Sequence, residues 1–399
     1  MEIFEREIYL KKIIPFIDKQ LIKVLTGQRR VGKTYILRQI REYIKKNKPE
    51  ANIIFIDKEL HDFDKIKTHD DLINYIKEHE KKSDNYLFID EIQEIQEFEK
   101  ALRSLQNKNN FDIYCTGSNA AMLSGEISTM LSGRQIIIRV HALSYNEFLQ
   151  FHKRSSSKES VLQYITYGGL PYLINLPDDM NVVGEYLKNI YATILFRDIV
   201  MRNNIRDVKF LENLVKFLAQ NTGSLFSAKN ISDYLKSQNI KKSVPVITNY
   251  LKFLEDAFFL NIVSRFDIQG KKIFEIGEKI FFEDLGIRNA LTGFLPGDIH
   301  KNMENAVLNH LLITGYNVYV GKNKQKEIDF IATKNNEKVY IQVTYLLNDN
   351  NTIEREFGNL LEIKDNYPKY VISFDPFETP NTYKGVKHLI LENFLLNFE

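Results

Sequence analysis

The chain has 399 residues, of which 44% are hydrophobic and 27% charged, and its formal net charge at pH 7 is +2. This composition is typical of a globular protein with two to four domains, and the balanced charge excludes a basic signature of nucleic-acid binding over the whole chain. A single cysteine, Cys115, excludes an intrachain disulfide. The charged N-terminal stretch does not resemble a signal peptide, and no window approaches the ~18 apolar residues of a membrane span. We therefore expect a cytoplasmic protein without a membrane partner.

The first elements in chain order are a helical pattern over 4–19 and then a strand, a glycine-bounded loop and a helix over 21–40. The loop, residues 27–34, fits the pattern G-x-x-x-x-G-K-[ST]. Its glycines let the backbone curl towards a phosphate, and the N–H groups of the loop and of the helix start attract negative charge. The residues expected to bind a nucleotide are Gly27, Arg29, Arg30, Val31, Gly32, Lys33, Thr34 and Tyr35.

Within this loop two side chains have distinct expected roles. Lys33 is expected to reach the β- and γ-phosphates of ATP, and the Thr34 hydroxyl is expected to bind Mg²⁺. The alternative is a chance match in a loop that contains glycine. An apolar strand immediately before the loop and a helical pattern immediately after it favour the nucleotide site.

The stretch that follows alternates between strands and helices. Short apolar runs occupy 52–57, 86–90, 112–116 and 135–140, and helical patterns at 35–46, 70–81 and 94–106 separate them. Continuous apolar strands that alternate with helices predict an α/β domain with a parallel sheet covered on both faces. Ligands bind such sheets at the carboxyl ends of the strands.

The run at 86–90 ends in Asp90, and a second acid, Glu91, follows it directly. We expect Asp90 to bind Mg²⁺, directly or through water, and Glu91 to polarise the attacking water. The alternative is an ordinary helix start, where acids are favoured by the helix dipole. A small-molecule kinase does not need a water-activating glutamate after the aspartate, whereas an ATPase does.

Two further polar residues are candidates for the same site. Asn119 follows the run at 112–116 and is expected to sense the γ-phosphate, although a turn composed of turn-forming residues is the alternative. Arg134 begins the last strand, and we expect it near the ligand edge of the sheet as an arginine finger, unless it is a surface arginine. A finger acts across a subunit boundary, so this interpretation predicts a homo-oligomer.

At this point the sequence resembles a known family. The motifs GQRRVGKT, YLFIDEIQ, TGSNAAML and LSGRQ, in this order and spacing, are similar to those of prokaryotic AAA+ ATPases with a C-terminal domain of unknown function. The motifs YGGLP at 167–171 and LFRDI at 195–199 resemble the lid of that family. The resemblance implies ATP hydrolysis on an AAA+ core over residues 1–143, followed by a helical lid over 144–204, a winged helix over 205–295 and a nuclease-like domain over 296–399.

The predicted lid is helical. Ser144 and Glu147 form a capping-box pattern, and further helices are expected over 161–167, 182–191 and 191–201. The resemblance implies that the lid closes over the nucleotide and that Arg197 could contact phosphate. A surface pair of Arg197 with its neighbour Asp198 is the alternative.

The middle region, 205–295, shows three helical patterns over 210–220, 228–236 and 244–256, then strands over 260–266 and 271–276. Three helices followed by a hairpin is the winged-helix order, in which 244–256 is the recognition helix. DNA binding and a protein-docking role both fit this module. Basic residues expected near phosphates are Lys241, Lys242, Lys271 and Lys272, and the acids that dilute this patch are Glu255, Asp256, Glu275 and Glu278.

The C-terminal region contains a helix over 303–314, strands over 317–320, 327–332, 338–345 and 370–373, and a helix over 353–363. This order resembles the PD-(D/E)XK nuclease fold, in which Asp329 fits the metal-binding acid of one strand and Glu304 the acid of the helix upstream. The E-x-K position reads Gln342-Val343-Thr344 instead, and Lys338 is expected about 20 Å from Thr344. We therefore expect a nuclease fold without nuclease chemistry.

Taken together, the sequence predicts a Mg²⁺-dependent ATP hydrolase that acts as a switch or motor on an unidentified macromolecular partner, such as a protein. The alternatives are an ATP-regulated DNA-binding protein, which would use the winged helix, and an ATP-dependent nuclease.

Overall fold

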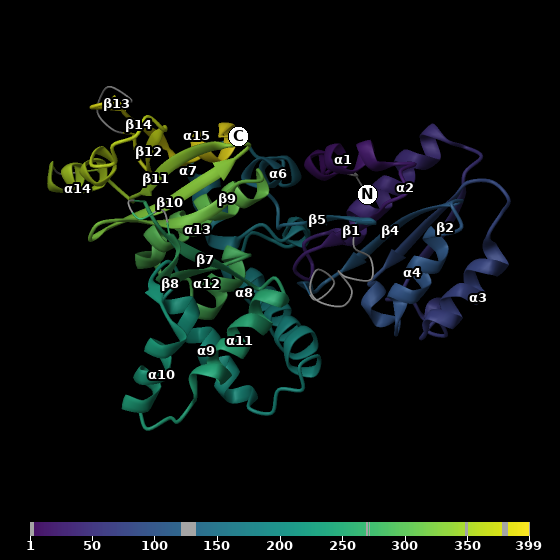
Figure 1. Ribbon diagram of the computed structural model, residues 1–399. Helices are drawn as coiled ribbons and strands as arrows, with labels where there is room; N and C mark the ends of the chain where they lie inside the picture. The colour runs from purple at the N-terminus through teal and green to yellow at the C-terminus, as the bar shows by residue number, and fades with distance from the viewer. Residues whose placement is uncertain are drawn as a thin grey trace. The chain divides into compact units, whose positions relative to one another are not determined.

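The computed structural model describes residues 4–120, 133–268, 270, 272–347, 350–376 and 382–398. The chain divides into two compact units, one of residues 1–141 with 256–258 and the other of residues 142–255 with 259–399 (Figure 1). None of the helices in the described part of the chain is long and apolar enough to cross a membrane.

The first unit is built on a parallel sheet. Its strands, among the described residues, are β1 (Ile22–Thr26), β2 (Asn52–Asp57), β3 (Asn85–Asp90), β4 (Phe111–Gly117) and β5 (Gln135–Arg139). They lie in the order β2-β3-β4-β1-β5, and every neighbouring pair is parallel. The four apolar runs after the glycine-bounded loop were predicted as strands within a residue of these bounds, and the predicted parallel sheet is confirmed.

Four helices accompany this sheet in the described part of the first unit: α1 (Glu7–Ile13), α2 (Lys33–Asn47), α3 (His69–His79) and α4 (Phe98–Gln106). The helix predicted over 4–19 is shorter than expected, because α1 changes into a short 3₁₀ turn at Ile14 with Pro15 in it. Thr68 caps α3 through a reciprocal pair of hydrogen bonds with Asp71.

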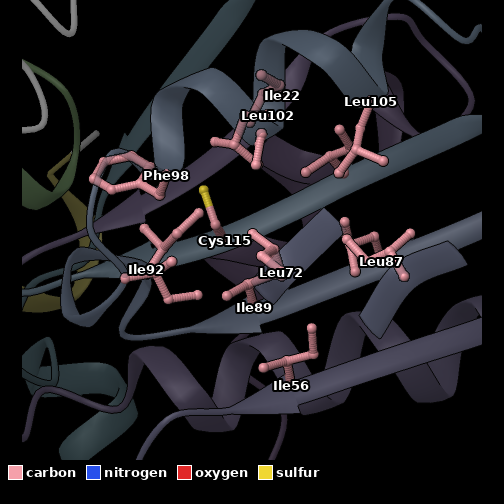
Figure 2. Packing of buried hydrophobic residues seen from close by; sticks show 14 of the residues in the cluster. Ile22, Ile56, Leu72, Leu87, Ile89, Ile92, Phe98, Leu102, Leu105 and Cys115 are labelled. Atoms are coloured by element: carbon pink, nitrogen blue, oxygen red, sulfur yellow. The ribbon is translucent and has the colours of Figure 1, made fainter. Parts of the chain in front are cut away.

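The core on one face of this sheet is formed by side chains of β1–β4 and of helices α3 and α4 (Figure 2). It includes Leu87, Ile89, Leu102, Leu105 and the single cysteine, Cys115, all of them buried. Burial raises the pKa of the Cys115 thiol to about 12, so this thiol is inert at neutral pH. The continuous apolar character of the strands follows from burial on both faces.

The second unit contains a larger, mixed sheet. Its described strands are β6 (Leu225–Phe226), β7 (Leu260–Asp267), β8 (Lys272–Phe282), β9 (Asn317–Asn323), β10 (Lys326–Lys334), β11 (Glu337–Val343), β12 (Lys369–Ser373), β13 (Thr382–Tyr383) and β14 (Val386–Ile390). They lie in the order β13-β14-β12-β11-β10-β9-β7-β8-β6.

The helices described in this unit are α6 (Tyr145–Phe151), α7 (Lys158–Tyr167), α8 (Met180–Thr193), α9 (Val208–Gln220), α10 (Ala228–Ser237), α11 (Val244–Asp256), α12 (Leu285–Thr292), α13 (Ile299–Ile313), α14 (Asn350–Leu361) and α15 (Leu391–Asn397). The capping box at Ser144 is confirmed, because its side chain accepts from the Glu147 N–H while Glu147 accepts from the Ser144 N–H. The last predicted lid helix is a π-helical segment, Ile194–Met201.

The sheet of the second unit runs across the boundary predicted near residue 296. β7 pairs in parallel with β9, with Arg265 opposite Val320 and Asp267 opposite Lys322 (Figure 1). The hairpin that the sequence assigns to a winged helix therefore shares one sheet with strands assigned to the nuclease-like region. The division of this half of the chain into separate functional domains stays a prediction.

Candidate functional site

The glycine-bounded loop leaves the sheet at the carboxyl end of β1. Gly27 has φ +147°, and a Cβ at this position would lie 2.1 Å from the Val140 carbonyl oxygen, so only glycine fits. Gly32, with φ +96°, directly precedes α2. The two glycines thus permit the tight turn from strand to helix that the sequence pattern requires.

Lys33 is buried under this loop. Its Nζ donates to the carbonyl oxygens of Gly27 and Gln28, each at 3.0 Å. These contacts hold a compact positive charge against the inner side of the loop. A phosphate oxygen is a stronger, charged acceptor for such an ammonium than a neutral carbonyl.

Thr34 and Asp90 are brought together from different elements. The Thr34 hydroxyl donates to Asp90 Oδ2 at 2.7 Å, and Thr116 at the end of β4 donates to the other carboxylate oxygen. Burial raises the pKa of Asp90, while the two hydroxyl donors act in the opposite direction. The carboxyl ends of β1, β3 and β4 thus place a threonine hydroxyl and a carboxylate side by side, which are oxygen donors of the kind Mg²⁺ prefers.

Glu91 follows in a left-handed conformation, with φ +52°, and is buried. Its N–H donates to the Thr116 hydroxyl at 2.9 Å, and Gln93 donates to its carboxylate. Burial favours the neutral acid, but the charges of Lys33 and Arg29 outweigh this effect, so the pKa of Glu91 lies below its ordinary value. The carboxylate is therefore ionised at neutral pH and can accept a proton or a hydrogen bond.

The remaining predicted residues of the loop differ in exposure. Arg29 is buried and its guanidinium lies 3.3 Å from the Glu59 carboxylate. Arg30 has φ +71° and is exposed, Val31 is buried, and Tyr35 in the first turn of α2 is half-buried. Their contacts with a nucleotide stay predictions.

Asn119 and Arg134, the other two candidate catalytic residues, lie at opposite edges of the sheet. Asn119 is buried and follows the end of β4, at the same edge as the loop. Arg134 directly precedes β5, and its carbonyl accepts from Ile22 N–H at the start of β1. Its guanidinium bonds Asn107 at 3.2 Å. The expectation that Arg134 lies near the ligand edge is wrong, because the start of a parallel strand lies at the amino edge. A finger role across a subunit boundary stays a prediction.

One buried residue at this site has no signal in the local sequence pattern. Arg6 is fully buried, and its guanidinium donates to the Val31 carbonyl at 2.8 Å and to the His141 carbonyl at 3.1 Å. Its own N–H donates to the Gln39 side chain at 3.2 Å. Arg6 thus links the N-terminal segment to the loop, to α2 and to the chain beyond β5.

In the second unit, the structure tests the placement of several predicted DNA contacts. Lys242 pairs with Asp207 at 2.5 Å and lies over the Phe210 ring, so its charge is partly neutralised. Lys241 is exposed. Lys271 lies outside the described residues, as does the side chain of Lys272. Arg197 is exposed within the π-helical segment, and its role at the nucleotide stays a prediction.

The acids predicted in the C-terminal region come together, with a partner that the sequence did not indicate. Lys279 of β8 places its Nζ 2.6 Å from Glu304, 2.7 Å from Glu327 and 3.4 Å from Asp329. Lys338, the basic residue expected on the neighbouring strand, is not among these contacts. Among the described residues no group of three or more histidine, cysteine or acidic side chains is arranged to hold a metal ion.

Comparison with known proteins adds two matched regions. Residues 19–149 match the model of an AAA domain, and residues 158–298 match a domain of unknown function (DUF8612). An uncharacterized protein of Haemophilus influenzae is 35% identical and covers 98% of each chain. Another, from Methanocaldococcus jannaschii, is 34% identical, with 89% of this chain and 80% of that protein covered.

Among solved structures, the Aeropyrum pernix ORC1 protein in complex with DNA is similar, with a TM-score of 0.34 and 11% identity over 72% of this chain and 92% of that one. A structural similarity this weak indicates nothing about function. The match to the Haemophilus influenzae protein, at 35% identity over 98% of each chain, shows that the two proteins are related. The chain, whose residues 19–149 match an AAA domain and include a parallel sheet and the glycine-bounded loop, therefore belongs to the family that includes this Haemophilus influenzae protein.

Proposed function

We propose that the chain binds ATP with Mg²⁺ and hydrolyses it to ADP and phosphate. The observation that carries this proposal is the meeting of the loop with two strand ends, where Thr34 lies 2.7 Å from Asp90 and Lys33 is held inside the loop. The AAA domain match over 19–149 supports the same activity.

The residues of the site divide the chemistry between them. Lys33 would exchange its carbonyl partners for phosphate oxygens and offset their negative charge. Thr34 and Asp90 would hold Mg²⁺, which neutralises the phosphates when bound. Both side chains offer oxygen donors, so the residues fit this ion.

Glu91 is the proposed base. It is ionised at neutral pH, and Gln93, Ser118 and its own N–H hold it in place at the edge of the site. An ionised carboxylate fixed beside the loop can orient a water and accept its proton as the bond to the γ-phosphate forms. Asn119, buried at the same edge, is proposed to orient the γ-phosphate.

We further propose that the chain forms a homo-oligomer. In this assembly, ATP hydrolysis changes the conformation of the chain and so acts on a macromolecular partner. An ATPase without a partner would only dissipate ATP, and the second unit offers a large sheet and several helices for contacts. DNA is not chosen as the partner, because one of its expected basic contacts, Lys242, is engaged by Asp207.

The decisive experiment separates binding from turnover. Lys33→Ala should abolish ATP binding in a calorimetric titration, whereas Lys45→Ala on the exposed side of the same helix should not change it. Glu91→Gln should bind ATP as the native protein does and lose turnover by about 10²–10⁴-fold. Its control, Glu94→Gln, removes a nearby exposed carboxylate. Unchanged phosphate release by Glu91→Gln would remove Glu91 from the mechanism, and absence of ATP binding by the native protein would end the proposal.

A further inference from the structure

The carboxylate cluster of the second unit contains its own cation. Lys279 contributes an ammonium group that contacts Glu304 of α13 and both Glu327 and Asp329 of β10. The side chains of Lys279 and Glu304 are 3% and 5% exposed, so the ammonium and this carboxyl group meet away from water, where burial raises the pKa of Glu304 to about 8. Of the acids, Glu327 is the most exposed.

The surroundings close the cluster from two sides. A Cβ on Gly223 would lie 2.7 Å from a Glu304 carboxylate oxygen, so the turn after α9 packs directly on this acid. Asp329 accepts from the Val343 N–H at 2.9 Å on the side of β11.

Electrostatics favours a charged lysine here. Burial alone would lower the pKa of Lys279, but the carboxyl groups of Glu304, Asp329 and Glu327 outweigh burial and raise it. Isolated carboxylates buried in this manner would be strongly destabilising, and one centrally placed ammonium offsets several of them at once.

We propose that Lys279 is a built-in counter-cation, which occupies the centre of this carboxylate cluster and joins β8, α13 and β10 into one body that needs no divalent metal ion. The strand β8 was assigned from the sequence to a winged helix, whereas α13 and β10 were assigned to a nuclease-like domain. The ion cluster therefore connects the two regions, alongside the pairing of β7 with β9. A divalent metal ion would have to displace the ammonium before these acids could support metal-dependent cleavage.

The test compares Lys279→Met with Lys326→Met in the full-length protein. Lys326 lies on β10 and makes an exposed ion pair with Glu362 at 2.6 Å, so it controls for loss of a surface charge. Removing one partner of a buried pair should lower the melting temperature of the second unit by about 6–20 °C. The Lys326 variant should shift it by about 4 °C at most. Hydrogen exchange followed by mass spectrometry assigns the loss to peptides of β8 and α13.

A second variant keeps the test informative if Lys279→Met folds poorly. Adding Asp329→Asn to Lys279→Met removes an acid that the ammonium no longer offsets, at nearly constant shape, so the double variant should melt above the single one. The proposal is overturned if Lys279→Met melts like Lys326→Met, or if the second substitution lowers the melting temperature further.

Metal binding and cleavage provide an independent arm. Native protein and Asp329→Asn should bind the same number of Mn²⁺ ions in the absence of nucleotide, and neither should cut plasmid DNA with Mg²⁺ or Mn²⁺. A bound Mn²⁺ that disappears in Asp329→Asn, or Asp329-dependent cleavage, would show that a metal displaces the lysine and would refute the built-in cation.

Discussion

The buried guanidinium of Arg6 should be essential for the stability of the first unit. Arg6→Met keeps most of the apolar volume of the side chain and removes its donors. The carbonyl oxygens of Val31 and His141 then lose contacts of 2.8 Å and 3.1 Å in a buried setting. Each such loss costs about 1–3 kcal/mol, so the substitution should lower the free energy of unfolding by about 2–6 kcal/mol.

The measurement is urea unfolding of the full-length protein, followed by far-ultraviolet circular dichroism, with and without ATP and Mg²⁺. Because Val31 belongs to the glycine-bounded loop, which is proposed to bind ATP, ATP should also bind more weakly to Arg6→Met. The control is Arg41→Met on α2, whose partly exposed side chain donates to its neighbour Glu42 and lies over the Phe55 ring but contacts neither Val31 nor His141 in the described residues. If Arg6→Met were no less stable than Arg41→Met, the idea that Arg6 braces the loop would be wrong.

Three further outcomes are expected at the nucleotide site. Glu91 must be ionised to act as a base, and the charge of Arg29 helps to keep the pKa of Glu91 low. Arg29→Met should therefore raise this pKa and move the acid limb of the pH–turnover profile towards neutral pH. An unchanged acid limb would contradict this electrostatic coupling. Thr34→Val should reduce the affinity for ATP in the presence of Mg²⁺ more than the affinity for ATP without metal, as measured by calorimetry at several Mg²⁺ concentrations. Equal losses of the two affinities would argue that Thr34 does not bind the metal. Arg134→Ala should leave turnover of the monomer unchanged, because the residue lies at the amino edge of its own sheet; loss of turnover in diluted, monomeric protein would contradict that placement.

The sequence was most informative where local pattern and chemistry coincide. The two glycines of the loop at 27–34 adopt positive φ, and the motif that contains them is local and recognisable. The close approach of the Val140 carbonyl to Gly27, by contrast, is a long-range contact that the motif alone does not indicate. The strands were predicted well, because a buried parallel strand is a short continuous apolar run. Asp90 and Glu91 follow such a run directly, so their place at the ligand edge was predictable.

The errors and omissions have a different physical origin. Arg134 was misplaced because it precedes its strand instead of following it. In a parallel sheet, residues that precede a strand lie at the amino edge, whereas ligands bind at the carboxyl edge. Arg6 and Lys279 were missed because their partners lie 25 to 135 residues away in the sequence, and neither residue stands in a pattern that indicates burial. Long-range contacts of buried charged side chains are decided by tertiary packing.

The parallel pairing of β7 with β9 has a practical consequence for anyone who wishes to study the C-terminal region alone. Cutting the chain near residue 296 would separate these strands and leave each with a row of unsatisfied backbone donors and acceptors. Such open edges recruit other chains, so fragments divided there should aggregate or exchange strands, and useful truncations should keep residues 259–398 continuous.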